Sequence, residues 1–241
     1  MVFEFIQVKT RVVKPPRDEI WDILDGIVPV DGDIIFIASK ILAIHQGRCV
    51  AAKDADKTEL IKREAERVLP AVHACGFKYH LTVTGNVLIP DAGIDESNAD
   101  GHYILWPKDT DKLCAEIRAR FINKYSLKKL GIVATDGHVT PLRTGVTGIT
   151  TGLAGFNPLK DMRGGTDIFG RKMGVTQVNL IDPLTAVAVL LMGEAAEQTP
   201  VVILRGYGGI PFCDGGSMKA FKIPPESDLY GPLIDMMKKQ Q

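Results

Sequence analysis

Acidic and amide side chains lie beside glycines in residues 91–101, directly after the apolar, strand-like residues 87–90. Carboxylate and amide oxygens on a short turn are hard ligands of the kind that Mg²⁺ and Mn²⁺ prefer. Asp95 is the first candidate ligand in this stretch. The structural alternative is a turn in which Asp and Asn side chains bond their own backbone.

Two more acids lie in similar local settings. Asp136 follows the apolar residues 131–135 at the expected end of a strand, and Glu194 follows the apolar residues 180–192. Taken singly, each acid is better explained by a turn, a helix cap or a solvated loop. A magnesium–nucleotide site, however, draws carboxylates from several chain-distant strand ends, because the ion needs charge neutralisation but keeps waters. The three acids together therefore favour a metal-dependent nucleotide enzyme.

The remaining motifs are less specific. No Walker A pattern occurs, so a nucleotide would not bind through a P-loop. Residues 161–172 concentrate Arg, Lys and Asp around glycines, and they fit either a polar double turn with salt-bridged arginines or an anion-binding loop. His138 could act as an acid or base near neutral pH, with a surface-loop histidine as the alternative.

Composition indicates a globular protein. Of the 241 residues, 45% are hydrophobic and 24% are charged, which is ordinary for a globular protein. The charges of the 29 basic and 29 acidic residues cancel, so no overall electrostatic field favours binding to nucleic acid or to an anionic membrane. The four cysteines lie far apart, which suggests free thiols in a reducing compartment. The N-terminus does not resemble a secretory signal, and the apolar residues 183–193 are too few to span a bilayer. A cytoplasmic location is therefore expected.

Apolar periodicity predicts strands and helices without a regular βαβ rhythm. Strands are expected at residues 3–9, 34–38, 77–84, 87–90, 131–135 and 201–204, with a tight turn at Gly85-Asn86. Helices are expected at residues 18–24, 53–68, 109–125 and 180–192, the last one buried, and a capping helix from residue 224 with a frayed basic end. A mixed α/β (α+β) architecture is thus favoured over a Rossmann or P-loop fold. One domain over residues 1–241 is expected, with two subdomains around a shared cleft as an open alternative.

The segment Gly93-Ile94-Asp95-Glu96-Ser97-Asn98 resembles the G-[IL]-D-x-S-N signature of the coenzyme F420-0:L-glutamate ligases, the CofE-type γ-glutamyl ligases. The similarity covers most of the chain in the correct order. Its further segments are residues 31–33, 39–40, 47–48, 135–136, 155–161, 167–171, 191–194, 200–202 and 205–206.

The resemblance implies an intertwined homodimer of CofE-like fold that joins a substrate carboxylate to the amine of L-glutamate, using GTP and Mg²⁺ or Mn²⁺. ATP in place of GTP and an additional monovalent cation remain open. By position, Asp95, Asp136 and Glu194 match the family's metal ligands, and Gly137 would offer a backbone carbonyl. The positions that match its nucleotide contacts are Ser39, Lys40, Asn98, Met192, Gly193, Glu194, Ala195, Ala196, Glu197, Gln198 and Thr199.

One loop departs from the family pattern. Relatives read T-D-[ST]-x-G-R-x-[WF]-R where residues 135–143 read T-D-G-H-V-T-P-L-R, and Ile44 stands where a second lysine is common. The metal positions are retained, but part of the expected acceptor side is changed. Coenzyme F420-0 is the expected acceptor. The alternatives are a folate- or pteroate-type acceptor and a non-catalytic nucleotide-binding protein on the same scaffold.

The expected mechanism follows from chemical need. A carboxylate does not react with an amine at neutral pH, so the γ-phosphate must first convert it to an acyl phosphate, and bound metal would stabilise the phosphate charge. Arg143, Arg163 and Arg171 are the candidates for holding substrate carboxylates, and Arg143 and His138 are the candidate catalytic residues.

Overall fold

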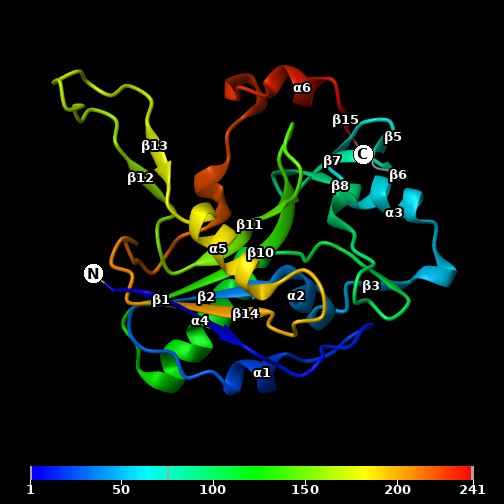
Figure 1. Cartoon of the computed structure of the whole chain (residues 1–241), viewed down its shortest axis with the longest axis horizontal. Helices are drawn as coiled ribbons and strands as arrows, with labels where there is room; N and C mark the ends of the chain where they lie inside the picture. Colours follow the sequence, from blue (N-terminus) through cyan, green and yellow to red (C-terminus); the bar gives the residue numbers. More distant parts are fainter. Residues whose placement is uncertain (1, 75, 240–241) are drawn as a thin grey trace.

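A five-stranded mixed sheet forms the centre of the computed structural model, which describes residues 2–74 and 76–239 (Figure 1). The strand order is β1 (Glu4–Val8), β14 (Val201–Arg205), β2 (Asp33–Ala38), β10 (Leu130–Val139) and β11 (Val146–Ala154). β2 and β10 run parallel, whereas the other neighbours are antiparallel.

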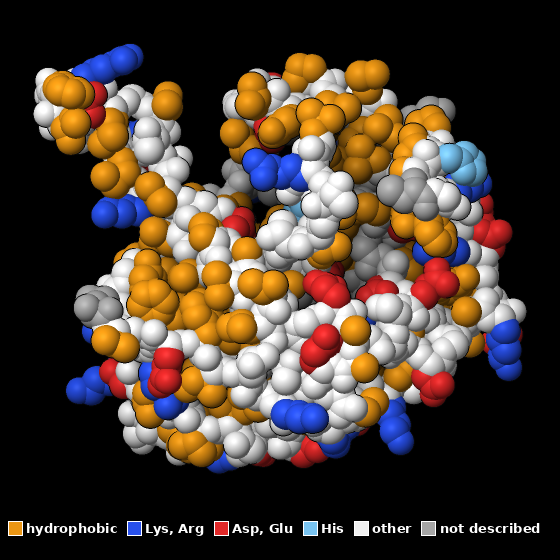
Figure 2. All heavy atoms as spheres, in the orientation of Figure 1, with side chains coloured by type: hydrophobic (Ala, Val, Ile, Leu, Met, Phe, Trp, Pro, Cys, Tyr) orange, Lys and Arg blue, Asp and Glu red, His pale blue; other side chains and the backbone are white. Residues whose placement is uncertain are grey.

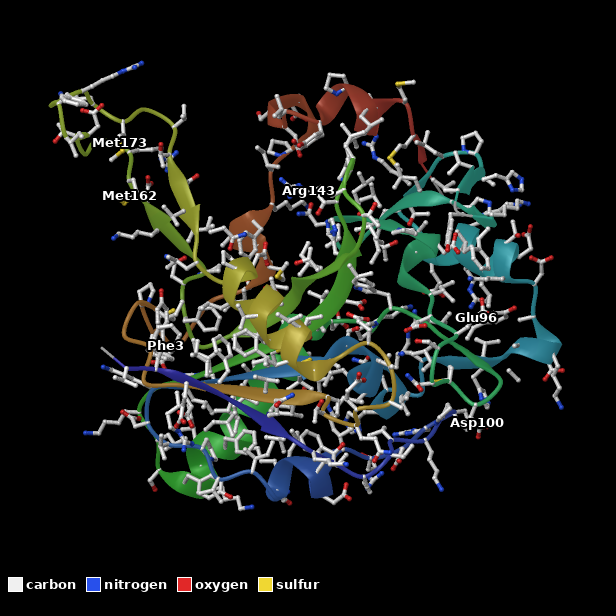
Figure 3. All side chains as sticks on the ribbon, in the orientation of Figure 1. Phe3, Glu96, Asp100, Arg143, Met162 and Met173 are labelled. Atoms are coloured by element: carbon white, nitrogen blue, oxygen red, sulfur yellow. The ribbon has the colours of Figure 1, made fainter. Side chains whose placement is uncertain are left out.

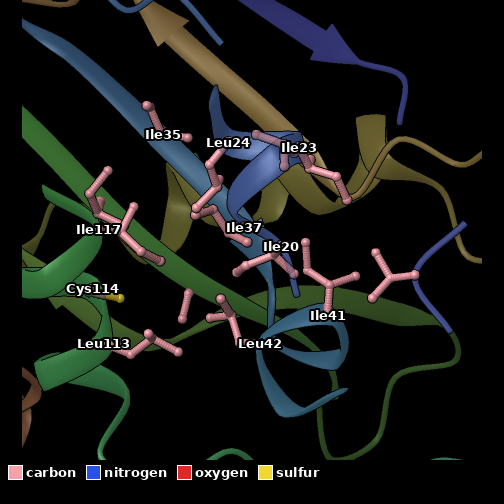
Figure 4. Packing of buried hydrophobic residues seen from close by; sticks show 14 of the residues in the cluster. Ile20, Ile23, Leu24, Ile35, Ile37, Ile41, Leu42, Leu113, Cys114 and Ile117 are labelled. Atoms are coloured by element: carbon pink, nitrogen blue, oxygen red, sulfur yellow. The ribbon is translucent and has the colours of Figure 1, made fainter. Parts of the chain in front are cut away.

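Helices cover both faces of this sheet. α1 (Trp21–Asp25), α2 (Ser39–His45) and α4 (Thr110–Tyr125) pack on the face that carries Ile35 and Ile37 (Figure 4). α5 (Asp182–Met192) packs on the opposite face against Ile34 and Phe36. Because β2 is buried on both faces, its sequence is a continuous apolar run rather than an alternation.

A smaller sheet lies beside the central one, on the right in Figure 1. Its order is β15 (Lys238–Lys239), β4 (Arg67–Val68), β7 (Leu81–Thr84) and β8 (Val87–Pro90). Gly85 and Asn86 both have positive φ, so the predicted tight hairpin turn between β7 and β8 is confirmed. The neighbouring elements are β3 (Cys49–Ala51), η1 (Ala52–Asp54), α3 (Lys57–Glu64), β5 (Val72–Ala74), β6 (Phe77–Tyr79), η2 (Asp91–Gly93) and β9 (His102–Ile104).

Two peripheral segments complete the chain. The hairpin of β12 (Leu159–Asp161) and β13 (Gln177–Asn179) stands away from the body, with apolar side chains at its outer end (Figures 1 and 2). The C-terminal segment passes through η3 (Met218–Phe221), η4 (Pro225–Ser227) and α6 (Gly231–Asp235). The single capping helix predicted from residue 224 is therefore wrong: α6 is short, and its end leads into β15, which pairs with β4.

The predicted α+β class, with several sheets, is confirmed, but further elements differ from prediction, among them the strand predicted at residues 77–84, which is divided into β6 and β7. The helix predicted at residues 53–68 ends at Glu64, because Ala65 is extended and the chain then joins the small sheet. β10 does not end at Thr135, since pairing with β11 continues it to Val139. α5 is buried on one face only, and Leu190 is 80% exposed.

Two further sequence-based expectations bear on the chain as a whole. Cys49, Cys114 and Cys213 are free thiols, as expected, and Cys75 lies outside the described residues. Within residues 2–74 and 76–239, no helix is long and apolar enough to cross a membrane.

The buried Asp33 at the start of β2 provides a test of fold stability. Its carboxylate is 0% exposed and accepts hydrogen bonds from Arg205 Nε at 3.0 Å and Nη2 at 2.7 Å. Removing one partner of a fully buried ion pair leaves an uncompensated charge and costs about 3–5 kcal/mol. Because the Arg205 side chain is 31% exposed, we expect Arg205→Met to lower the free energy of unfolding in urea by less than that, but by more than the roughly 0–1 kcal/mol of an exposed pair. Arg120→Met, which breaks the exposed pair with Asp25, is the matched control; an equal loss in both variants would contradict the expectation.

Candidate active site

A cavity of about 290 Å³ opens at the edge of the central sheet where β2 ends. Its walls come from five separate parts of the chain. The lining residues are 10–13, 38–41, 44, 95, 97–98, 135–137, 189 and 192–200. Figure 2 shows acidic side chains gathered along the lower rim of a hollow in this view of the molecule.

Strand pairing explains why these segments meet. In the parallel pair of β2 and β10, Ala38 lies opposite Thr135, so Ser39 and Asp136 follow side by side. The Pro200 carbonyl accepts a hydrogen bond from the Ala38 amide at 2.9 Å, which brings the loop after α5 to the same edge. The carboxyl ends of adjacent parallel strands are a common position for ligand sites.

Lys40 and Asp95 form the central ion pair of the cavity. Lys40 Nζ lies 2.7 Å from Asp95 Oδ2, and it also donates to the backbone and side-chain oxygens of Ser97, each at 2.8 Å. The Ser97 amide donates to Asp95 Oδ1 at 2.7 Å. Burial opposes ionisation of Asp95, but the Lys40 ammonium and the Ser97 donors outweigh it and lower the pKa of this carboxyl.

Asp136 differs from Asp95 because no cation is paired with it in the described part of the chain. Burial raises the pKa of Asp136 to about 7, although the Gly137 amide and the Ser39 hydroxyl favour its ionised form, and the nearby charge of Asp95 raises the pKa further. A proton therefore competes for this carboxylate near neutral pH.

Glu194 comes from the loop after α5. Gly193, which precedes it, has a φ of +79°, and the Asn98 side chain donates to the Ala195 carbonyl at 2.8 Å, which joins this loop to that of Asp95. Partial burial raises the pKa of Glu194, and the charges of Asp95 and Glu197 add to this effect while Lys40 opposes it. A Cβ placed on Gly137 would lie 3.8 Å from Glu194 Oε1, so these two positions face each other.

The donor chemistry of the cavity fits a hard divalent cation. Four carboxylates line it, those of Asp95, Asp136, Glu194 and Glu197, and Lys40 is the one lysine in its lining. Among the described residues, however, no three His, Cys, Asp or Glu side chains are close enough to surround one ion by themselves. Phosphate oxygens and waters would have to complete the coordination, as is common for Mg²⁺.

The structure brings together most of the residues that the sequence nominates. Asp95, Asp136, Gly137, Ser39, Lys40, Asn98 and residues 192–199 all line the one cavity. Arg143 lies instead on the exposed loop between β10 and β11 (Figure 3). Arg163 lies on the protruding β12–β13 hairpin, where it is bonded to Asp161. Arg171 is exposed on the same hairpin, and His138 is half-buried outside the lining, where burial lowers its pKa although Asp182 opposes this. The substrate and catalytic roles of these four residues stay predictions.

The sequence did not nominate residues 10–13, which form one wall of the cavity. Arg11 in this segment is held by Asp18 and Asp22, both at 2.7 Å, and by the Glu19 carbonyl at 2.8 Å. The Thr10 amide donates to the Gln198 carbonyl at 2.9 Å. This wall has no local motif, since it depends on the pairing of β1 with β14.

Comparison with known proteins shows the family of the chain. The model of the family described as F420-0:Gamma-glutamyl ligase matches residues 7–206. A coenzyme F420:L-glutamate ligase of Methanopyrus kandleri is 33% identical over 215 residues, 81% of this chain and 83% of that protein. A protein of the same name from Methanosarcina barkeri is 30% identical over 256 residues, 100% of this chain and 99% of that protein. The chain therefore belongs to the F420-0:gamma-glutamyl ligase family, and the predicted enzyme class, a ligase acting on glutamate, is confirmed.

The raised pKa of Asp136 predicts a pH-dependent stability without metal. The native pKa of about 7 exceeds the ordinary 3.8, so this group's contribution to stability is full below about pH 4 and is lost as pH rises through 7. Asp136→Asn should therefore raise the melting temperature more at about pH 8 than at about pH 5 in the presence of a chelator. The exposed Asp54→Asn is the control. A gain for Asp136→Asn that is the same at both pH values would contradict the prediction.

Proposed function

We propose that this protein is a GTP-dependent ligase that joins L-glutamate to the carboxylate of coenzyme F420-0. The observation that carries the proposal is the convergence of Asp95, Asp136 and Glu194 with Lys40 in one cavity, in a member of this family. The names of the similar proteins support the acceptor, since they are called coenzyme F420:L-glutamate ligases.

The proposed reaction has two steps. An oxygen of the acceptor carboxylate attacks the γ-phosphorus of GTP, which forms an acyl phosphate and releases GDP. The glutamate amine then attacks the acyl carbon, phosphate leaves with the electron pair of the broken C–O bond, and the amine loses a proton. Activation as an acyl phosphate provides the leaving group that a free carboxylate lacks.

The residues of the cavity have distinct roles in this proposal. Lys40 would neutralise phosphate charge, and residues 192–199 with Asn98 would form the nucleotide-binding wall. A divalent cation, Mg²⁺ or Mn²⁺, would supply charge stabilisation at the phosphates, held by Asp95, Asp136 and Glu194 with the Gly137 carbonyl. His138 lies outside the cavity lining, but it is the candidate base for the amine proton, because burial lowers its pKa and favours the neutral imidazole.

The function is tested by offering the purified protein GTP or ATP, Mg²⁺ or Mn²⁺, L-glutamate and F420-0. We expect phosphate release that depends on both glutamate and acceptor, and a product heavier by one glutamate residue. Asp95→Asn should reduce this activity by roughly a hundredfold or more, because even partners of metal ligands cost tenfold to a hundredfold. Asp100→Asn, an exposed change in the same loop, is the matched control.

The alternatives give different results in the same assay. Glutamate addition to a pteroate but not to F420-0 would show that the altered 137–142 loop has changed the acceptor. Nucleotide binding without product on either acceptor would indicate a non-catalytic protein. Full activity in Asp95→Asn would contradict the assigned role of this acid.

We also propose that the protein is a homodimer. Ile168 and Phe169 on the β12–β13 hairpin are 91% and 89% exposed, Leu190 on α5 is 80% exposed, and Leu142 on the β10–β11 loop is fully exposed. Apolar side chains gathered on a projecting hairpin are costly in water, and a second copy of the chain would cover them. Arg163 and Arg171 lie on the same hairpin, so the dimer would also decide which site they serve.

Dimerisation predicts that Phe169→Lys weakens self-association. We expect wild-type protein to have the mass of a dimer at micromolar concentration by light scattering, with an interface of more than roughly 2,000 Å². Phe169→Lys should shift the mass toward the monomer. Phe77→Lys, at a 65% exposed phenylalanine on β6, is the control. A wild-type monomer under these conditions would contradict the proposal.

A further inference from the structure

The turn that presents Asp95 to the cavity has an unusual backbone. Asp91, Ala92 and Gly93 have φ values of 51°, 57° and 68°. Residues other than glycine rarely adopt this left-handed backbone conformation. Three residues in succession keep it only where their surroundings hold them. The surroundings of this turn therefore control the position of Asp95.

One side of the turn is anchored to β7 and to Trp106. The Asp91 amide donates to the His80 carbonyl, and the His80 amide donates to Asp91 Oδ1, both at 2.8 Å. The Ala92 amide donates to Thr82 Oγ1 at 2.9 Å. A Cβ on Gly93 would lie 2.3 Å from the Trp106 ring, so the backbone lies directly on the indole.

The other side of the turn is held by one cation. Lys57, the first residue of α3, places Nζ 3.2 Å from Asp91 Oδ2 and 2.7 Å from Glu96 Oε1. Lys57 therefore bridges the residues on both sides of Asp95; Glu96 is labelled in Figure 3. The Asp91 side chain is only 7% exposed, and within the described residues the only other ionisable partner near it is His80, whose Nδ1 is 3.6 Å from Oδ1.

The backbone of Lys57 is itself fixed. Asp56 caps α3 by accepting hydrogen bonds from the amides of Thr58 at 2.7 Å and Glu59 at 3.2 Å. Burial disfavours the charged form of Lys57, but the contacts with Glu96 and Asp91 outweigh it and raise its pKa. Lys57 is thus charged at neutral pH.

We propose that Lys57 is a positioning residue for the ligase reaction, which holds Asp95 toward the cavity by clamping Asp91 and Glu96. This inference rests on the proposed function, since it assumes that Asp95 serves a metal. Lys57 lies outside the cavity lining and touches neither Asp95 nor the nucleotide wall. A purely structural lysine would affect melting without affecting the geometry at Asp95.

The test compares Lys57→Met and Lys57→Arg with Lys62→Met, which breaks the exposed pair with Glu59 on the same helix. Mn²⁺ binding to the protein without substrates is measured by electron paramagnetic resonance. Hydrogen exchange of the Asp95 amide, which donates to the Ile104 carbonyl at 2.9 Å, reports local opening. We expect Lys57→Met to weaken Mn²⁺ binding by roughly ten- to a hundredfold and to accelerate this exchange. Lys57→Arg should retain most of the Mn²⁺ binding and most of the protection of the Asp95 amide. Lys62→Met should equal the wild type in both measurements.

The inference would be overturned if Lys57→Met binds Mn²⁺ as tightly as the wild type and exchanges the Asp95 amide hydrogen at the same rate, even if its melting temperature is lower. If Lys57→Met does not fold, the variant Asp91→Asn/Lys57→Met removes the buried charge that needs a counter-ion. Weaker Mn²⁺ binding in the double variant than in Asp91→Asn alone supports the positioning role of Lys57. Equal Mn²⁺ binding in the two variants overturns it. A wild type that lacks ligase activity contradicts the proposed function. If the wild type has ligase activity but Lys57→Met and Lys62→Met show the same Mn²⁺ binding and the same exchange of the Asp95 amide, only this inference is contradicted.

Discussion

The parallel pairing of β2 with β10 determines where the start of α2 and Asp136 lie, at the centre of the cavity. Parallel neighbours end at the same edge, so the register of Ala38 with Thr135 brings the start of α2 beside Asp136. β2 is 0% exposed over Ile34, Ile35, Phe36 and Ile37, and a shift by one residue would exchange the side chains of its two apolar faces. The packing of the core therefore fixes the register, and the register fixes the distance between Lys40 and Asp136.

Charge within the cavity is shared unequally. Lys40 pairs with Asp95 and lowers its pKa, whereas Asp136 has no such partner and its pKa is raised to about 7. The pKa values of the two acids therefore shift in opposite directions. Pairing with Lys40 outweighs burial at Asp95, whereas burial prevails at Asp136.

Local patterns predicted the elements whose own sequence determines them. α4 follows from the helical spacing of Leu113, Ile117 and Phe121, and the β7–β8 turn follows from Gly85-Asn86. Predictions were wrong where a distant partner decides, as at Arg67 and Val68, which join a sheet rather than extend α3. The same reason limits the site. The acids could be recognised from their turns and motif, but the 10–13 wall depends on strand pairing across the whole chain, and the separation of Arg163 from the cavity depends on how a long hairpin projects.

The acid-rich cavity constrains how a nucleotide can bind under the proposed function. A triphosphate carries several negative charges, and the lining presents Asp95, Asp136, Glu194 and Glu197 against Lys40, with Arg11 already occupied by Asp18 and Asp22. Like charges brought together in a partly buried site repel more strongly than in water. Under the proposed function, binding of the polyphosphate would therefore be favourable only when it enters together with cations that the acids can hold. The same carboxylates that disfavour the free nucleotide would then favour its metal complex, and metal would be a condition of nucleotide binding as well as of phosphoryl transfer.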